Sequence, residues 1–83
     1  MIRVLVVDDD FRVAELHASY VARTEGFEVV GVAHTAREAL RLAETEQPDL
    51  VLLDEYLPDA SGTSLIGRMP GAVIVVSATQ DAA

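Results

Sequence analysis

Apolar residues in this chain form four short runs, and the segments between the runs carry apolar residues at helical spacing. The runs are four to six residues long and rich in β-branched residues, a pattern typical of strands buried on both faces. Alternation of such strands with helices predicts a parallel sheet with right-handed crossovers. The predicted strands are Ile2–Val7, Phe27–Val32, Leu50–Leu53 and Val73–Val76.

The first predicted helix covers Phe11–Arg23. Asp10 is a suitable N-cap before it, and Gly26 is a C-terminal signal after it. Phe11, Tyr20 and Phe27 are expected to lie in the core or against the helix ends. The predicted apolar face of this helix combines Val13, Leu16 and Tyr20 with Ala14, His17 and Val21.

The second helix is predicted from Thr35 to about Glu46, because Thr35 and Glu38 have the spacing of a capping box. Pro48 ends it. Its predicted buried residues are Ala36, Ala39, Leu40 and Ala43. A third helix, over Thr63–Met69, can have two turns at most, since Gly67 interrupts it and Pro70-Gly71 follows.

Composition limits the classes of protein to consider. The 83 residues suffice for one small domain, and a hydrophobic content of 51% is that of a globular chain. The sequence has no long apolar run, no recognisable signal peptide and no cysteine, so we expect a cytoplasmic protein without a membrane span or thiolate metal site. A net charge of −8 disfavours direct nucleic-acid binding by this segment.

Oxygen-bearing side chains follow three of the four predicted strands. Asp8 and Asp9 follow the first, Asp54 the third, and Ser77 the fourth. If these strands are neighbours, their carboxyl ends bring the side chains together, and the repulsion between carboxylates requires a cation such as Mg²⁺. With that charge screened, Asp54 can act as a nucleophile toward phosphorus and form an aspartyl phosphate. The Ser77 hydroxyl can donate a hydrogen bond to the phosphoryl group.

Each of these residues also has a simpler interpretation. Asp54 and Asp59 are common turn residues, and Asp8 and Asp9 are favourable charges before a helix. Asp10 is interpreted as a cap. The remaining candidates are interpreted as solvated, surface or loop residues without a ligand role: Glu55, His17 and His34.

Three motifs together resemble the receiver domain of a two-component response regulator. The acidic pair after the first strand of that domain is resembled by Val4–Asp10. Its phosphoacceptor strand and loop are resembled by Pro48–Asp54 with Leu57–Gly62, and its fourth strand with a switch hydroxyl by Val73–Ala78. The stretches Asp10–Ala14 and Val30–Thr35 are similar to the branch that senses citrate and C4-dicarboxylates.

This resemblance implies an α/β, flavodoxin-like, doubly wound parallel sheet with strand order 2-1-3-4. It implies that Asp54 accepts the phosphoryl group from a histidine kinase or a small acyl phosphate. Mg²⁺ would be bound by Asp54, by Asp9 directly, by Asp8 through water or as a weaker partner, and by the backbone carbonyl of Tyr56. Ser77 would turn toward the phosphoryl group, and Ala78 would leave room for it. The expected role is control of an output, transcription above all, and not metabolic catalysis.

The chain also departs from the pattern of a complete receiver. The fifth strand and the last two helices are missing, and so are the fifth-strand lysine and aromatic switch residue; all six basic residues are arginine. We therefore interpret residues 1–83 as a partial receiver domain. Loss of the covering helix predicts an exposed apolar patch over the first and third strands, and self-association through it or the open sheet edge.

Two other functions remain open. A truncated or degenerate receiver can act as an interaction or dimerisation module without phosphorylation, and the missing lysine favours this. A small phosphatase or phosphotransferase with an aspartate nucleophile would need a second carboxylate two residues later. Position 56 is tyrosine, so this class is the weakest of the three.

Overall fold

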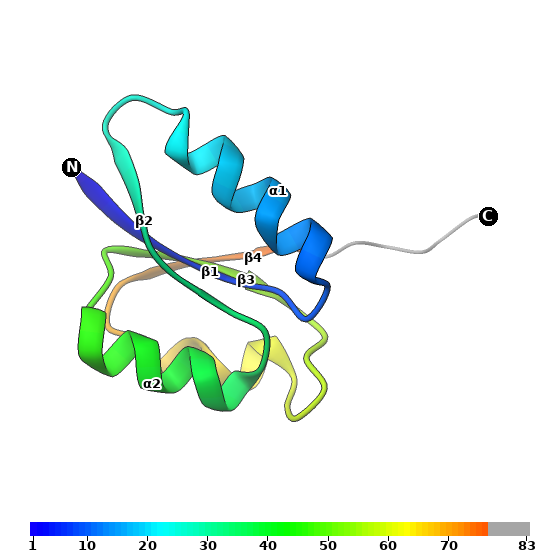
Figure 1. Cartoon of the computed structure of the whole chain (residues 1–83). Coiled ribbons are helices and arrows are strands. Elements are labelled where there is room, and N and C mark those ends of the chain that lie inside the picture. The colour runs from blue at the N-terminus through cyan, green and yellow to red at the C-terminus, as the bar shows by residue number, and fades with distance from the viewer. Residues whose placement is uncertain (77–83) are drawn as a thin grey trace.

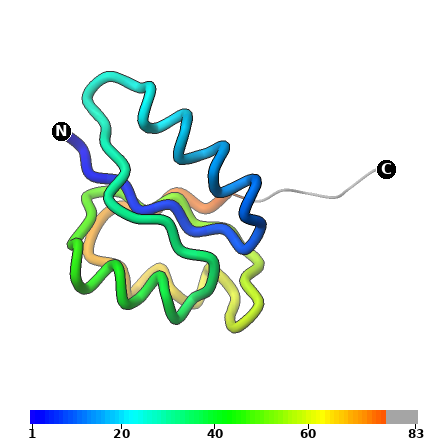
Figure 2. Tube along the Cα trace, in the orientation of Figure 1, coloured from blue at the N-terminus to red at the C-terminus, as the bar shows by residue number. Residues whose placement is uncertain are grey.

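The computed structural model describes residues 1–76. The elements are β1 (Ile2–Val7), α1 (Phe11–Ala22), β2 (Phe27–Ala33), α2 (Ala36–Glu46), β3 (Leu50–Asp54), the 3₁₀ helix η1 (Gly62–Arg68) and β4 (Ala72–Val76). The four parallel strands form one sheet in the order β2-β1-β3-β4, the order that the resemblance to a receiver implied. Helix α1 lies on one face of the sheet, and α2 and η1 lie on the other (Figures 1 and 2).

Each predicted boundary either matches the observed one or differs from it by one residue. Strand β3 extends to Asp54 itself, so the proposed nucleophile ends the strand instead of following it. The third predicted helix is a 3₁₀ helix that begins at Gly62. Glycine is a poor helix former, and Gly62 and Gly67 both fall within this short segment, which explains why regular α-helix does not form.

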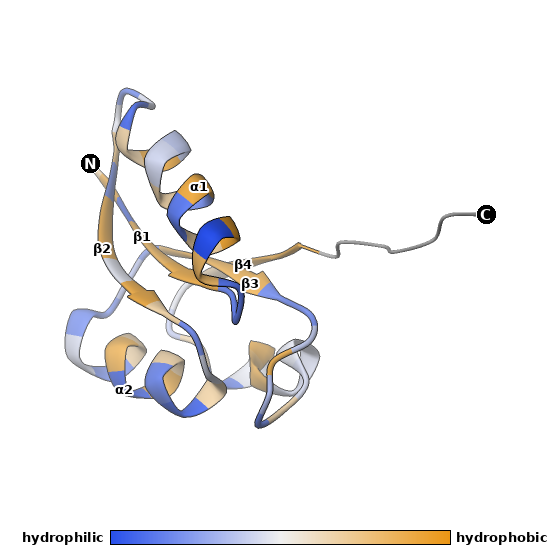
Figure 3. Ribbon diagram, turned by 45° about the vertical axis from the view of Figure 1, so that its right-hand side comes forward, coloured by the Kyte–Doolittle hydropathy of each residue, from blue (hydrophilic) through white to orange (hydrophobic). Residues whose placement is uncertain are grey.

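One face of the sheet is covered by α2 and η1, and we call it the packed face. Helix α2 packs its three buried alanines against this face, and Leu65 of η1 packs beside them. The strand residues beneath them are exposed by 1% or less and alternate along β1 and β3: Leu5, Val7, Val51 and Leu53. Figure 3 shows the mostly hydrophobic strands of the sheet between helices in which hydrophobic and hydrophilic residues alternate.

The opposite face, which we call the open face, is covered by α1 alone among the elements of residues 1–76. Val4 and Val6 of β1 are fully buried beneath it. Leu52 of β3 is half-buried, and Ile74 of β4, its partner in the sheet, is 51% exposed. The predicted patch over the first and third strands is therefore wrong for β1, because α1 covers that strand. The exposed apolar surface lies over β3 and β4.

The predicted apolar face of α1 is confirmed for Ala14 and Val21 and is wrong for Leu16 and Tyr20. Leu16 and Tyr20 are both more than half exposed, whereas Ala14, Ala18 and Val21 contact the sheet. The two alanines explain the difference, since small side chains allow the helix axis to approach β1 closely. Tyr20 instead lies under the Arg23 guanidinium, with 5.1 Å between the guanidinium carbon and the ring centroid.

At the amino edge of the sheet, the turn before β3 is held by its neighbours. The Arg3 backbone N–H donates to the Asp49 carboxylate (2.9 Å), and the Asp49 N–H donates to the Arg3 carbonyl (2.8 Å). The chain entering β4 passes so closely that a Cβ at Gly71 would lie 2.5 Å from the Asp49 carbonyl oxygen. This position therefore admits no larger residue without a backbone shift.

Candidate functional site

An acidic cluster lies at the carboxyl edge of the sheet, where β1 and β3 end side by side. Val7 pairs with Leu53, so the residues that follow them, Asp8 and Asp54, are neighbours in space. One carboxylate oxygen from each of Asp8, Asp9 and Asp54 lies within 4.8 Å of the others. Asp8 is buried, Asp54 partly buried and Asp9 exposed, so the cluster opens to solvent on one side.

The turn that carries Asp8 and Asp9 is fixed by hydrogen bonds from both sides. The Asp8 N–H donates to the Ala33 carbonyl (3.0 Å), and one Asp8 carboxylate oxygen accepts from the Asp10 N–H (2.9 Å). Asp10 itself accepts from the backbone N–H groups of Arg12 and Val13 at the start of α1. The prediction that Asp10 is a helix cap is confirmed.

His34 also contacts this turn, which the sequence did not predict beyond a loop position. Its Nδ1 lies 2.9 Å from the Asp8 carbonyl oxygen. Its ring stacks on Phe11, with 3.7 Å between the ring centroids and 10° between the planes. Phe11 is more than half exposed, so it does not lie in the core; at the start of α1 it packs against the His34 ring instead.

The loop after Asp54 folds back over the end of β3. The Tyr56 N–H donates to an Asp54 carboxylate oxygen (3.3 Å), and the Gly62 N–H donates to the Glu55 carbonyl (2.7 Å). A Cβ at Gly62 would overlap the Asp54 carbonyl oxygen, so glycine is needed for this close approach. The backbone carbonyl of Tyr56 as a metal ligand stays a prediction.

Asp59 has a role that the turn interpretation missed. Its carboxylate accepts from the N–H groups of Ala36 (2.7 Å) and Arg37 (3.0 Å), so it caps α2 from a distant loop. These two hydrogen bonds hold the pKa of Asp59 below its ordinary value. Thr35 caps the Glu38 N–H as predicted, but Glu38 returns to the His34 N–H instead of the Thr35 N–H of a capping box.

The electrostatics of the cluster favour a cation. Burial raises the pKa of Asp54, and the charges of Asp8 and Asp9 add to this rise, while the hydrogen bond from Tyr56 opposes it. Among residues 1–76, Arg3 forms an ion pair with Glu46, and no basic side chain forms one with any of the three aspartates. Three carboxylates facing solvent are a donor set that suits a hard, oxygen-preferring ion such as Mg²⁺.

Ser77 and Ala78 lie outside the described residues. Within residues 1–76, the groups of histidine and acidic side chains close enough to share a metal ion include only the three aspartates, so neither His17 nor His34 belongs to one. Neither α-helix described by the structure has the length and apolar character needed to cross a bilayer.

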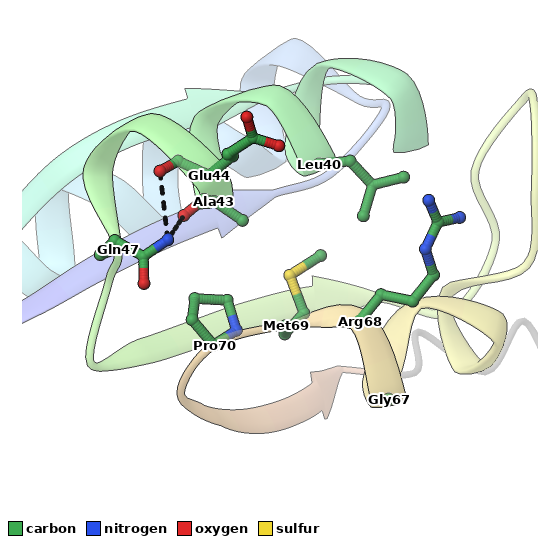
Figure 4. A pocket seen from close by; sticks show the side chains of 8 residues that line it. All are labelled: Leu40, Ala43, Glu44, Gln47, Gly67, Arg68, Met69 and Pro70. Atoms are coloured by element: carbon green, nitrogen blue, oxygen red, sulfur yellow. Dashed lines mark hydrogen bonds between the residues drawn. The ribbon is translucent and has the colours of Figure 1, made fainter.

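A cavity of about 330 Å³ lies between α2 and η1, and the acidic cluster does not line it. Figure 4 shows Leu40 and Met69 pointing into it from opposite sides, with Arg68 at its rim. The Gln47 side-chain amide donates hydrogen bonds to the Ala43 and Glu44 carbonyls at the end of α2. The cavity therefore belongs to the packing of η1 on α2 and not to the aspartates.

Comparison with known proteins agrees with this geometry. A profile of the response regulator receiver domain matches residues 4–83. The chain belongs to the response regulator receiver family. It is similar to the transcriptional regulatory proteins CitT of Bacillus subtilis (40% identity over 96% of this chain and 38% of CitT) and DcuR of Escherichia coli (41% over 100% and 38%). These relatives confirm the predicted citrate and C4-dicarboxylate branch.

Among solved structures, the receiver chain resembles the MaeR response regulator bound to beryllium trifluoride. The TM-score is 0.82 at 29% identity, over 98% of this chain and 70% of that one. The chain therefore spans less than half the length of the curated relatives and about two-thirds of a solved receiver structure.

Proposed function

We propose that this receiver is a Mg²⁺-dependent phosphoaspartate switch in which Asp54 accepts a phosphoryl group from a histidine kinase. The observation that carries the proposal is the approach of three carboxylates to within 4.8 Å at the carboxyl ends of two adjacent parallel strands. Ligands bind at this edge in open α/β sheets. Membership of the receiver family supports the same assignment.

The residues have distinct roles in this proposal. Asp8, Asp9, Asp54 and the Tyr56 carbonyl would hold Mg²⁺, which would supply the positive charge that lets an anionic phosphoryl donor approach the acids. An Asp54 carboxylate oxygen forms the new P–O bond while the P–N bond of the phosphohistidine breaks. The electron pair of that bond returns to the imidazole nitrogen of the kinase. Ser77 would donate its hydroxyl to a phosphoryl oxygen.

The wider context is part of the same proposal. Because the curated relatives are transcriptional regulatory proteins, the output is the control of transcription through a domain outside this segment, in the cytoplasm. The acidic segment itself, with net charge −8, does not contact DNA. Apart from accepting the phosphoryl group, it performs no metabolic catalysis.

The test is adduct formation at Asp54. The chain is incubated with Mg²⁺ and acetyl phosphate for mass spectrometry, or with Mg²⁺ and beryllofluoride for ¹⁹F NMR, since MaeR binds beryllium trifluoride. We expect an adduct that needs Mg²⁺ and is absent in Asp54→Asn. Asp10→Asn is the matched control, because asparagine caps a helix about as well as aspartate and Asp10 lies outside the cluster. An adduct that persists in Asp54→Asn would show that another group is the acceptor.

The open face supports a second candidate, a module that self-associates without phosphorylation. Within residues 1–76, β4 pairs on one side only, and the apolar surface over β3 and β4 is partly exposed. A chain that folds and self-associates but forms no adduct would favour this role. Turnover of added phosphoesters would instead favour the phosphatase class.

A further inference from the structure

We propose that His34 is a positioning residue for the metal-binding acids, and that it acts through the peptide bond between Asp8 and Asp9. This inference rests on the proposed function, since it concerns the same cluster. His34 belongs to the turn between β2 and α2, and its ring reaches the turn between β1 and α1. It therefore links two crossovers that leave the carboxyl edge of the sheet.

The hydrogen bond fixes both the donor and the orientation of the peptide. A carbonyl oxygen only accepts, so His34 Nδ1 carries the proton and donates to the Asp8 oxygen at 2.9 Å. That oxygen lies in the plane of the Asp8–Asp9 peptide bond, and peptide groups are rigid. Holding the oxygen therefore restricts the backbone rotations that aim the side chains of Asp8 and Asp9.

The other polar groups of Asp8 have partners of their own, and His34 binds its carbonyl oxygen. The Asp8 N–H is taken by the Ala33 carbonyl, and one carboxylate oxygen by the Asp10 N–H. Without the imidazole, the peptide group before Asp8 keeps its hydrogen bond to the Ala33 carbonyl. The peptide group between Asp8 and Asp9 loses the hydrogen bond to its carbonyl oxygen. Asp9 is exposed, so other packing restrains it little.

Phe11 and Glu38 hold the imidazole in place. The Phe11 ring stacks on it at 3.7 Å and 10°, and the Glu38 carboxylate accepts from the His34 backbone N–H at 3.0 Å. Groups that orient metal ligands without binding the metal affect affinity strongly in other metal sites. His34 has the placement of such a group, with the difference that it acts on the main chain.

The experiment separates the hydrogen bond from the stacking. His34→Phe keeps an aromatic ring beside Phe11 and loses the donor, whereas His34→Asn loses the ring and places an amide N–H near the position of Nδ1. His17→Phe is the matched control, because it makes the same chemical change on α1, outside the cluster. The dissociation constant for MgCl₂ alone is measured by calorimetry on each folded chain, and the melting temperature is recorded separately.

We expect His34→Phe to raise the dissociation constant about fivefold, the size of one net hydrogen bond, and His34→Asn to restore it within about twofold. His17→Phe should match the original chain. If His34→Phe does not fold, His34→Ala is compared with His34→Asn, because both lack the ring stacked on Phe11 and only asparagine keeps a donor. Melting temperatures that fall without a change in Mg²⁺ affinity would assign His34 a structural role only and overturn the inference. If the original chain binds no Mg²⁺, the proposed function falls as well, which distinguishes the two failures.

Discussion

The two faces of the sheet are built from the same strands and the same kinds of residue, yet they are covered very differently. On the packed face, α2 and η1 together bury Leu5 and Leu53 completely. On the open face, α1 buries Val4 but leaves Leu52 half-buried and Ile74 mostly in solvent. Apolar strand residues thus show that a strand can be buried, while the helices available decide which face is buried.

The largest expected effect compares core residues on the two faces. Leu5→Ala, on the packed face, should lower the free energy of unfolding by about 3 kcal/mol, because it removes a fully buried side chain and leaves a cavity. Leu52→Ala, on the open face, should cost about 1 kcal/mol, since part of that side chain already contacts water. Urea denaturation followed by circular dichroism measures both. Equal losses would mean that the open face is covered in solution.

The second prediction concerns what covers the open face. Ile74→Lys should reduce self-association measured by sedimentation velocity, and should change the free energy of unfolding by no more than about 0.5 kcal/mol. Val73→Lys is the comparison on the same strand. Val73 lies on the packed face, so we expect this substitution to destabilise the fold. Self-association that survives Ile74→Lys would place the contact elsewhere.

The third prediction concerns Asp54, at the edge shared by both faces. Its pKa in the folded chain is raised above 3.8, so protonation stabilises the fold, and this contribution is lost as pH rises through the folded-state pKa. Without metal, Asp54→Asn should therefore melt a few degrees higher than the original chain at pH 7, with the gain shrinking toward pH 3.8. Mg²⁺ should stabilise the original chain more than the variant. A lower melting temperature for the variant at pH 7 would contradict this.

The smallest expected effect is at Asp59, which caps the helix of the packed face. Its pKa is lowered from 3.8, so its contribution to stability is present above that pH and is lost as pH falls through the folded-state value. Asp59→Ala should lower the melting temperature at pH 7 and have less effect below pH 3. Thr35→Ala, which removes the other cap of α2, is the reference for the size of the loss. A loss at Asp59 that does not depend on pH would argue against the charge.

Most of the architecture could be predicted because its signals are local. The β-branched runs, the caps at Asp10 and Thr35, and acids at the ends of strands each depend on a few consecutive residues. Adjacency of β1 and β3 then brings Asp8 and Asp54 together without further information.

The features that sequence reasoning missed depend on contacts between distant segments. Asp59 caps a helix that begins 23 residues earlier, and His34 reaches a carbonyl 26 residues away. The orientation of α1 depends on the fit of Ala14 and Ala18 against β1, which spacing alone does not decide. For Asp59, the only available signal was a capping residue type in a loop next to the acids.

The two glycines that press against the ends of β3 limit the length of the chain between them. Gly62 lies against the Asp54 carbonyl at the end of this strand, and Gly71 lies against the Asp49 carbonyl just before its start. The segment between the two glycines, which contains η1, therefore spans β3 and is held close to it at both ends. An insertion or deletion between these two positions would have to distort this segment or break one of the two close contacts. We expect such changes to destabilise the fold more than changes at the turn from Arg23 to Gly26, where a Cβ at Gly26 would meet no atom within 4 Å.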